Sequence, residues 1–218
     1  MTQLLKDKPW MLGVVIVAIA GAAFGISSLM STEAHEWNGA AYDPAREGVK
    51  FTLTDTDGES MSSSELEGKI VMLYFGYTYC PDFCPATLTD FQRVKADLGD
   101  DAENVAFAMV SVDPERDTPE RMEEYLAFFD PEFIGLTGTE DELTPVKQEF
   151  GITTLERDAT PEIDNFYYVD HSTKTYVLNT DGELALEYPF GVTAEEMIED
   201  VLEDVPAVDR GEHAPDVE

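Results

Sequence analysis

Two stretches of the chain are apolar at almost every position rather than at alternate ones. They run from Ile70 to Tyr77 and from Val105 to Val112, and both are rich in residues that favour strands. A strand with two apolar faces must be covered on both sides, which is typical of the centre of a parallel sheet. Apolar residues at helical spacing follow the first run, so the pattern predicts β–α units with helices on both faces of a sheet.

The remaining expected elements close this sheet with antiparallel pairs and add further helices. Residues 152–165 are expected to be irregular. The expected elements are a hairpin from residue 49 with its turn at Asp57-Gly58, a helix opening at Thr118-Pro119, a strand over 133–136, a helix from the capping box at 139–142 to residue 150 (or from Thr144, because Pro145 interrupts it), a strand over 166–169, a hairpin of 175–178 with 184–188, and a helix opening at 193–196.

The chain begins with an expected membrane anchor. The run from Trp10 to Met30 carries no charge, and at about 1.5 Å per residue it can cross a bilayer core of about 30 Å. Lys6 and Lys8 precede it, which predicts a cytoplasmic N-terminus and a domain on the extracytoplasmic side of the cell membrane. A cleaved signal peptide is the alternative. The expected parts are a cytoplasmic segment 1–9, an anchor 10–30, a linker 31–47, a domain 48–206 and an acidic tail 207–218.

The net charge restricts the partners. Only 13 Lys and Arg oppose 46 Asp and Glu, a formal net charge of −33, so the phosphate backbone would repel the chain and nucleic acid is excluded as a partner. Adaptation to high salt, as in halophilic proteins, explains an acidic surface spread over the whole domain. An acidic docking face for a basic partner is the alternative.

The chain has only two cysteines, Cys80 and Cys84, and they stand four residues apart where the first buried strand gives way to a helix. Functional groups of α/β sheets collect at this end of the strands. Two thiols at this spacing can form a redox-active disulfide or bind a soft cation such as copper(I) or zinc. The nearby helix N-terminus lowers the pKa of a thiol and so favours the thiolate.

Among the three histidines, His171 follows an expected strand, whereas His35 and His213 fall in the linker and the tail. If that strand lies beside the first buried strand, the imidazole of His171 reaches the thiols. Two thiolates and one imidazole suit copper in either oxidation state, or zinc with an open fourth position. The alternative is an ordinary loop histidine.

Two further features have a structural and a functional interpretation. The segment from Asp113 to Pro119 reads as a turn followed by a helix cap, or as a source of an orienting group, Asp113 or Arg116, for the thiols. The methionines, such as Met72 and Met109, fall at apolar positions and are expected to fill the core rather than to bind copper.

Three motifs, in order, resemble the signatures of the Sco/SenC family of copper-binding, thioredoxin-like proteins. They are Gly76-Tyr77-Thr78-Tyr79-Cys80-Pro81-Asp82-Phe83-Cys84-Pro85, Val110-Ser111-Val112-Asp113-Pro114-Glu115-Arg116-Asp117-Thr118-Pro119, and Val169-Asp170-His171-Ser172 with Tyr176-Val177-Leu178 and Asp181-Gly182. The resemblance spans roughly residues 51 to 204. One departure is Tyr79, where many relatives carry His.

The resemblance implies a thioredoxin-like α/β fold, a central mixed sheet flanked by helices, with the N-terminal hairpin as an extension. It implies that Cys80, Cys84 and His171 bind Cu(I) or Cu(II). It further implies a membrane-anchored copper chaperone for the CuA site of cytochrome c oxidase subunit II, or a reductant of the cysteines at that site. Other copper carriers and thioredoxin-like reductants are further expected partners.

Three functions use the same cysteines. A metallochaperone needs both thiols and His171, with an open position through which a partner thiolate can enter. A thiol–disulfide oxidoreductase needs an attacking Cys80 and a resolving Cys84, but no histidine. A thiol peroxidase of the peroxiredoxin type normally has Thr three residues before its reactive cysteine, and Tyr77 at that position argues against it.

Overall fold

The computed structural model describes residues 35–48, 50–158 and 167–204. The chain divides between Glu36 and Trp37, and every element below belongs to the second unit. Within the described residues, no helix has the length and apolar character needed to span a membrane. The expected anchor 10–30 and tail 207–218 lie outside the described residues, so both remain predictions.

An eight-stranded mixed sheet forms the centre of this unit, in the order β1-β10-β9-β4-β5-β6-β2-β3. Its middle strands, β4 (Ile70–Gly76) and β5 (Val105–Ser111), are buried at every residue and pair in parallel from Ile70 opposite Val105 to Gly76 opposite Ser111. The two apolar runs are therefore the central strands that the sequence predicts. The strand β6 (Ile134–Thr137) pairs in parallel with β5, whereas β9 (Thr175–Leu178) is antiparallel to β4.

Antiparallel strands complete both edges. On one side, β2 (Thr52–Asp55) and β3 (Ser60–Ser62) form the expected N-terminal hairpin, and β2 pairs with β6. On the other side, β10 (Leu184–Tyr188) pairs with β9 as expected and also with β1 (Ala40–Arg46). The predicted α/β architecture with a central mixed sheet is confirmed.

The strand β1 corrects the predicted linker, because it lies within 31–47 and belongs to the sheet. Just before it, the backbone and side-chain amides of Asn38 donate to the carboxylate of Asp200, at 3.0 and 3.1 Å, and Asp200 is fully buried. Most residues of β1 are exposed, so the strand lacks the apolar alternation that identifies strands in a sequence. The domain therefore begins before residue 48.

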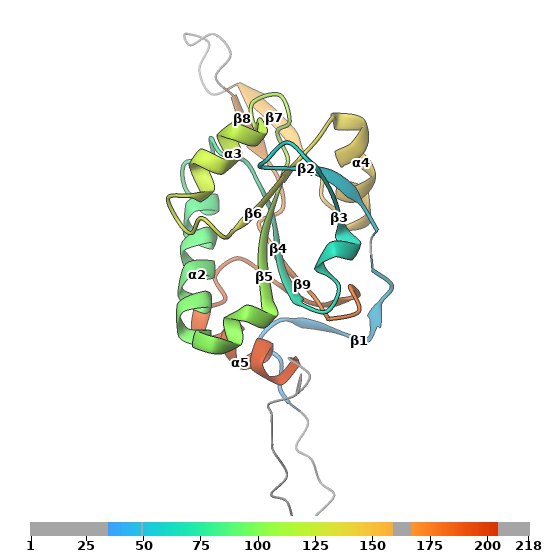
Figure 1. Ribbon diagram of the computed structural model, residues 1–218, viewed down its shortest axis with the longest axis vertical. Helices are drawn as coiled ribbons and strands as arrows, with labels where there is room; N and C mark the ends of the chain where they lie inside the picture. The colour runs from blue at the N-terminus through green and yellow to red at the C-terminus, as the bar shows by residue number, and fades with distance from the viewer. Residues whose placement is uncertain (1–34, 49, 159–166, 205–218) are drawn as a thin grey trace, which may run out of the picture. The chain divides into compact units, whose positions relative to one another are not determined.

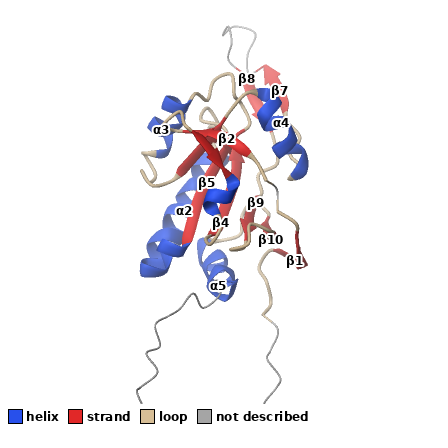
Figure 2. Cartoon of the chain, turned by 45° about the vertical axis from the view of Figure 1, so that its right-hand side comes forward, coloured by secondary structure: helices blue, strands red, loops and turns tan. Residues whose placement is uncertain are grey.

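Four α-helices flank the sheet: α2 (Phe83–Leu98), α3 (Pro119–Leu126), α4 (Glu140–Glu149) and α5 (Ala194–Asp204). In Figures 1 and 2, α2 and α3 lie on one side of the strands and α4 on the other. Two 3-10 turns, η1 (Ser63–Leu66) and η2 (Gly99–Asn104), connect neighbouring elements. The hydroxyls of Thr118 and Thr139 cap α3 and α4. Because α4 starts at Glu140 with Pro145 inside it, the alternative start at Thr144 is wrong.

The strand before His171 does not lie beside β4, which was the condition under which the sequence analysis brought the imidazole to the thiols. The strand β8 (Tyr167–Asp170) pairs with β7 (Leu155–Asp158) in a separate two-stranded sheet, and β9 is the neighbour of β4. The range expected to be irregular therefore contains a strand. Its sequence is Leu-Glu-Arg-Asp, which has no apolar run or alternation and so no strand signal.

We expect a chain that begins at residue 48 to be less stable than one that begins at residue 35. The shorter chain loses β1 and the Asn38 donors to buried Asp200, and the lost hydrogen bonds to a buried charge predict a decrease of about 2–4 kcal/mol in the free energy of unfolding. Urea unfolding measures the difference. Asn38→Ala in the longer chain, which removes only the side-chain donor, should cost about 1 kcal/mol. Equal stability of the two chains would show that residues 35–47 do not stabilise the domain and act as a linker.

Candidate metal centre

The two cysteines occupy the junction between β4 and α2. Cys80 lies in the loop and is half-buried, whereas Cys84 is the second residue of α2 and is fully buried. Both are free thiols. The backbone N–H of Cys84 donates to the sulfur of Cys80 at 3.4 Å, so this sulfur occupies the N-terminus of the helix, where a negative charge is stabilised.

The buried sulfur of Cys84 packs in a space that two residues of β4 define. The hydroxyl of Tyr74 donates to it at 3.5 Å, and burial raises the pKa of Tyr74, so the hydroxyl keeps its proton. At Gly76, a Cβ atom would stand 3.0 Å from this sulfur and 2.6 Å from the ring of Tyr74. Gly76 therefore leaves the room that Cys84 needs, and the thiol position is fixed by the sheet.

His171 follows β8 directly and reaches the same place. Its Nε2 atom lies 4.0 Å from the sulfur of Cys84, and its Nδ1 atom lies 2.7 Å from the carbonyl oxygen of Ser172. Because a carbonyl only accepts, Nδ1 donates to it, and Nε2 is the ring nitrogen that faces the sulfur. The rings of Tyr77 and Tyr74 contact the imidazole edge to face, with centroids 5.8 and 6.1 Å away.

The prediction that this imidazole reaches the thiols is confirmed, but the route differs. The condition stated for it, that the preceding strand lies beside β4, is not met in the described sheet. Instead, the backbone N–H of Val169 donates to the hydroxyl of Tyr77 at 3.3 Å. The side chain of Tyr77, just after β4, therefore holds β8, the strand before His171. Backbone pairing between β8 and β4 does not occur among the described strands.

These residues fit a soft metal ion only after a small rearrangement. Metal–sulfur and metal–nitrogen bonds of about 2.3 and 2.0 Å together span at most about 4.3 Å, and the 4.0 Å between Cys84 and His171 falls inside that limit. In the part of the chain that the structure describes, no three His, Cys, Asp or Glu side chains are grouped as a ready metal-binding set. Cys80, the third candidate ligand, is half-buried and lines the same cavity as His171.

The two thiols have opposite acid–base character. Hydrogen bonding from the Cys84 thiol, helped by His171 and by the backbone N–H groups of Cys84 and Asp82, outweighs the opposing effect of burial and lowers the pKa of Cys80 to about 4. Burial, together with the neighbouring Cys80 charge, raises the pKa of Cys84 well above its ordinary value. The sequence left open which cysteine is the thiolate, and the structure assigns it to Cys80.

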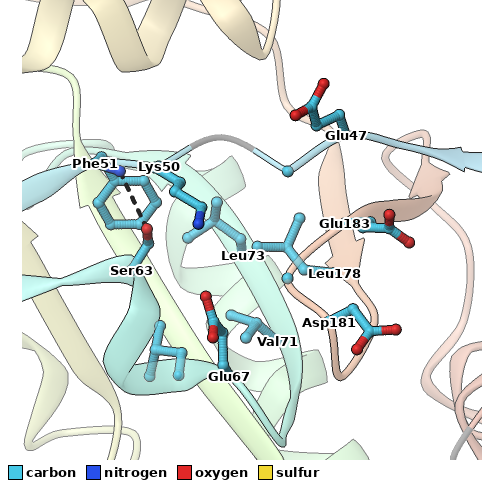
Figure 3. A pocket seen from close by; sticks show the side chains of 13 residues that line it. Glu47, Lys50, Phe51, Ser63, Glu67, Val71, Leu73, Leu178, Asp181 and Glu183 are labelled. Carbon is cyan, nitrogen blue, oxygen red and sulfur yellow. Dashed lines mark hydrogen bonds between the residues drawn. The ribbon is translucent and has the colours of Figure 1, made fainter.

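A cavity of about 530 Å³ opens over Cys80 and His171, and its walls include the apolar residues Pro81, Phe83 and Val169. A second cavity, of about 360 Å³, lies elsewhere, over Val71, Leu73 and Leu178. Lys50 and four acidic side chains surround that second cavity, as Figure 3 shows. It contains no cysteine or histidine among its lining residues, so the sulfur chemistry belongs to the first cavity.

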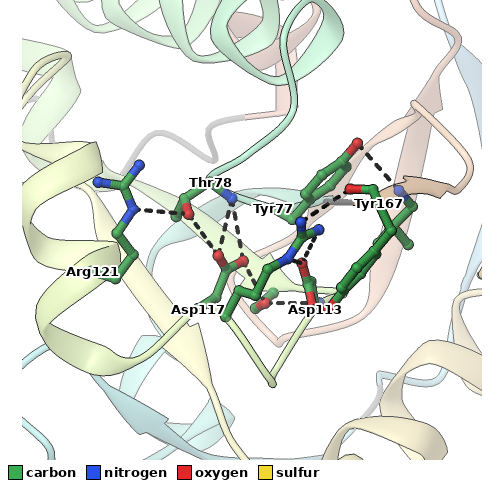
Figure 4. Close-up of polar contacts among 9 residues, drawn as sticks. Tyr77, Thr78, Asp113, Asp117, Arg121 and Tyr167 are labelled. Carbon is green, nitrogen blue, oxygen red and sulfur yellow. Dashed lines mark hydrogen bonds and ion pairs between the residues drawn. The ribbon is translucent and has the colours of Figure 1, made fainter. Parts of the chain in front are cut away.

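Asp117 holds the cysteine loop through hydrogen bonds, and the sequence analysis did not identify it as a residue of the site. It is fully buried, and its carboxylate accepts hydrogen bonds from the backbone and hydroxyl of Thr78 and from the hydroxyl of Ser111 (Figure 4). Burial raises the pKa of Asp117. The only signal in the sequence is its place directly before the helix cap Thr118. Tyr74 and Gly76 were likewise missed, because each reads as an ordinary residue of a buried strand.

Comparison with known proteins gives one consistent result. The SCO1/SenC family model matches residues 39–205, a range that holds every described strand and helix from β1 to α5. The SCO2-like protein of Rickettsia prowazekii is 33% identical over 157 residues, which cover 72% of this chain and 76% of that protein. The mitochondrial SCO2 protein of Saccharomyces cerevisiae is 33% identical over 188 residues, or 84% of this chain and 62% of that protein.

Solved structures agree with the sequence relatives. Bradyrhizobium japonicum ScoI with copper bound superposes with a TM-score of 0.66 and 35% identity, over 72% of this chain and 98% of that one. Apo Sco1 from Thermus thermophilus gives a TM-score of 0.70 and 32% identity, over 78% of this chain and 98% of that one. The thioredoxin-like α/β fold is thereby confirmed.

We expect alkylation of the reduced, metal-free protein by iodoacetamide to select Cys80. Because the pKa of Cys80 is lowered to about 4, its rate constant should change less than about 2-fold between pH 6 and 9, whereas an ordinary thiol of pKa about 8.5 gains roughly 10-fold per pH unit below its pKa. Buried Cys84 should react only in denaturant. Peptide mass spectrometry measures both sites. A Cys80 rate that rises 10-fold from pH 6 to 7 would contradict the assignment of the thiolate.

Proposed function

Because the chain belongs to the SCO1/SenC family, we propose that it is a copper metallochaperone that binds copper through Cys80, Cys84 and His171 and assists assembly of the CuA site of cytochrome c oxidase subunit II. The observation that carries this proposal is the 4.0 Å approach of the His171 Nε2 atom to the Cys84 sulfur. The copper bound to the ScoI relative supports the choice of metal.

The chemistry of the three side chains suits a cargo that must be released. Thiolates favour copper(I), and an added imidazole also suits copper(II). Three protein ligands leave a position into which a partner thiolate can enter. Cys80 lies at the cavity that opens to solvent, so an incoming cysteine of the acceptor can replace the half-buried ligand first while Cys84 and His171 still hold the ion.

The setting of this function is also a proposal. The uncharged run 10–30 would anchor the chain in the cell membrane with the domain on the extracytoplasmic side, where the CuA domain is the acceptor and other copper carriers supply the ion. The net charge of −33 would then be an adaptation of this exposed domain to high salt, or a docking face for a basic partner.

A second function, thiol–disulfide oxidoreductase, is favoured by the unequal thiols. The Cys80 thiolate attacks one sulfur of a substrate disulfide, so that a mixed disulfide forms and one substrate thiolate leaves. Cys84 then loses its proton and attacks the Cys80 sulfur, which releases the second substrate thiolate and leaves a Cys80–Cys84 disulfide. The substrate gains two electrons, the protein loses two, and a thioredoxin-like dithiol restores the starting state. The cysteines of the CuA site are the proposed substrate.

We expect His171→Ala to separate the two functions. The variant should lose copper(II) affinity by more than about 100-fold, because even an outer hydrogen-bond partner of a metal ligand is worth about 10-fold to 100-fold. It should keep dithiol redox activity, which needs no imidazole. Competition titration with optical and EPR detection of the thiolate–copper bands measures the affinity, and His35→Ala is the control. Unchanged affinity of His171→Ala would remove this residue from the site.

We expect the two Cys→Ser variants to behave differently toward a disulfide. Cys84→Ser keeps the half-buried Cys80 thiolate at the mouth of the cavity but lacks the resolving thiol, so it should accumulate a stable mixed disulfide with a peptide disulfide. Cys80→Ser leaves only buried Cys84 and should form none. Non-reducing electrophoresis and mass spectrometry distinguish them. Both variants should lose copper binding, and a mixed disulfide in Cys80→Ser would reverse the assigned roles.

A further inference from the structure

The strand that carries the histidine has little support from the rest of the sheet. The strand β8 belongs to the two-stranded sheet with β7 and not to the eight-stranded sheet that carries the cysteines. On the β8 side, side-chain contacts with the loops at the end of the large sheet hold His171 near Cys84, while four residues further along the chain Thr175 begins β9, opposite Tyr74 of β4. One of these side-chain contacts is the bond from the Val169 N–H to the Tyr77 hydroxyl.

Arg116 makes the other connection, with Asp113 and Tyr167, and we call these three residues the arginine clamp. The Nε and Nη2 atoms of Arg116 lie 2.6 and 2.5 Å from the same carboxylate oxygen of Asp113, and Nη1 donates to the backbone carbonyl of Tyr167 at 3.0 Å. The Tyr167 hydroxyl donates to the other carboxylate oxygen of Asp113 at 2.7 Å. These contacts link the three residues in a closed ring, and Figure 4 shows Asp113 and Tyr167 next to each other.

The same guanidinium group also contacts the cysteine loop. Its central carbon lies 3.5 Å from the ring centroid of Tyr167, 4.8 Å from that of Tyr79 and 5.8 Å from that of Tyr77. Tyr79 directly precedes Cys80, whereas Tyr167 is the first residue of β8. Arg116 therefore touches both chain segments that carry the metal-binding side chains, and its side chain is only 14% exposed.

We infer that Arg116 is a positioning residue, which holds β8 against the cysteine loop and so sets where His171 meets Cys84. For its effect on copper the inference rests on the function proposed above. The planar guanidinium donates hydrogen bonds from Nε and Nη1, places Nη2 in an ion pair and lays its flat face on the ring of Tyr167, and a lysine ammonium cannot reproduce that geometry. Arg116→Lys keeps the charge and most of the bulk, so it tests the geometry and not the charge.

The chain offers a matched control in Arg121. Its guanidinium also lies over the ring of Tyr79, at 5.1 Å, and it contacts Thr78 and Glu124. These polar partners belong to the cysteine loop and to α3, whereas the clamp reaches β8. Arg121→Lys therefore alters the same tyrosine contact and leaves the clamp intact.

The first measurement is copper(II) affinity, with the thiolate–copper charge-transfer band as its spectroscopic signature. Arg116→Lys should weaken binding by about 10-fold to 100-fold, as expected for a group that orients a metal ligand, and should shift the band toward that of His171→Ala. Arg121→Lys should change the affinity by less than about 3-fold. Equal effects of the two variants would overturn the inference.

A double-mutant cycle tests whether Arg116 acts through the histidine. In the His171→Ala background, Arg116→Lys should cause no further loss of copper affinity, because the group that it orients is gone. Additive losses would show that Arg116 affects the thiols directly and would overturn the assigned role.

Hydrogen exchange of the metal-free protein provides a readout that does not depend on copper. Backbone amides of 167–170 should exchange about 10-fold faster in Arg116→Lys than in the unsubstituted protein or Arg121→Lys, while those of β4 stay protected. If the protein binds no copper, the proposed function fails and this measurement alone decides the inference. Unchanged exchange would overturn it. If Arg116→Lys does not fold, Tyr167→Phe, which removes only the hydroxyl bonded to Asp113, replaces it with the same expected direction.

Discussion

The parallel pairing of β4 with β5 is the constraint on which the site depends. Gly76 and Ser111 stand opposite each other at the end of the two strands, so the loops that follow leave the sheet side by side. The first loop carries Cys80 and leads to Cys84 in the first turn of α2, and the second loop carries Asp113 and Asp117. The carboxylate of Asp117 then joins the two loops through Thr78 and Ser111. The shared edge thus places the loop that bears Cys80 next to the loop that bears Arg116.

Much of the fold could be predicted from the sequence, because its signals are local. A strand buried on both faces, such as β4, is apolar throughout, and a helix such as α4 begins with a capping box. The strands β1 and β7 were missed because most β1 residues are exposed and β7 is mainly charged. These strands are held by backbone hydrogen bonds to strands elsewhere in the chain. Such bonds leave no pattern of side chains that a single sequence could reveal.

The metal-binding residues themselves could also be predicted, but what holds them could not. Cysteines and histidines are few, so their chemistry is visible in the sequence, and Cys84 and His171 do meet. The supporting residues are common types whose roles arise from contacts between strands. Tyr74 reads as one more apolar residue until its hydroxyl is found on the Cys84 sulfur, and the contacts of Tyr77 and Arg116 with the strand before His171 are equally invisible in the sequence.

The two proposed functions require different features of the same site. The site contains an oriented imidazole that disulfide exchange does not require. Disulfide exchange needs an accessible thiolate and a resolving thiol within reach of it, which half-buried Cys80 and the neighbouring Cys84 provide. It does not need an imidazole whose Nδ1 is tied to the Ser172 carbonyl so that Nε2 is directed at the sulfur. That orientation is the one a metal ligand requires. The Tyr77 and Arg116 contacts that hold β8 in place therefore favour metal binding as the function around which this edge of the domain is built, with thiol exchange as a reaction the same sulfurs can also perform.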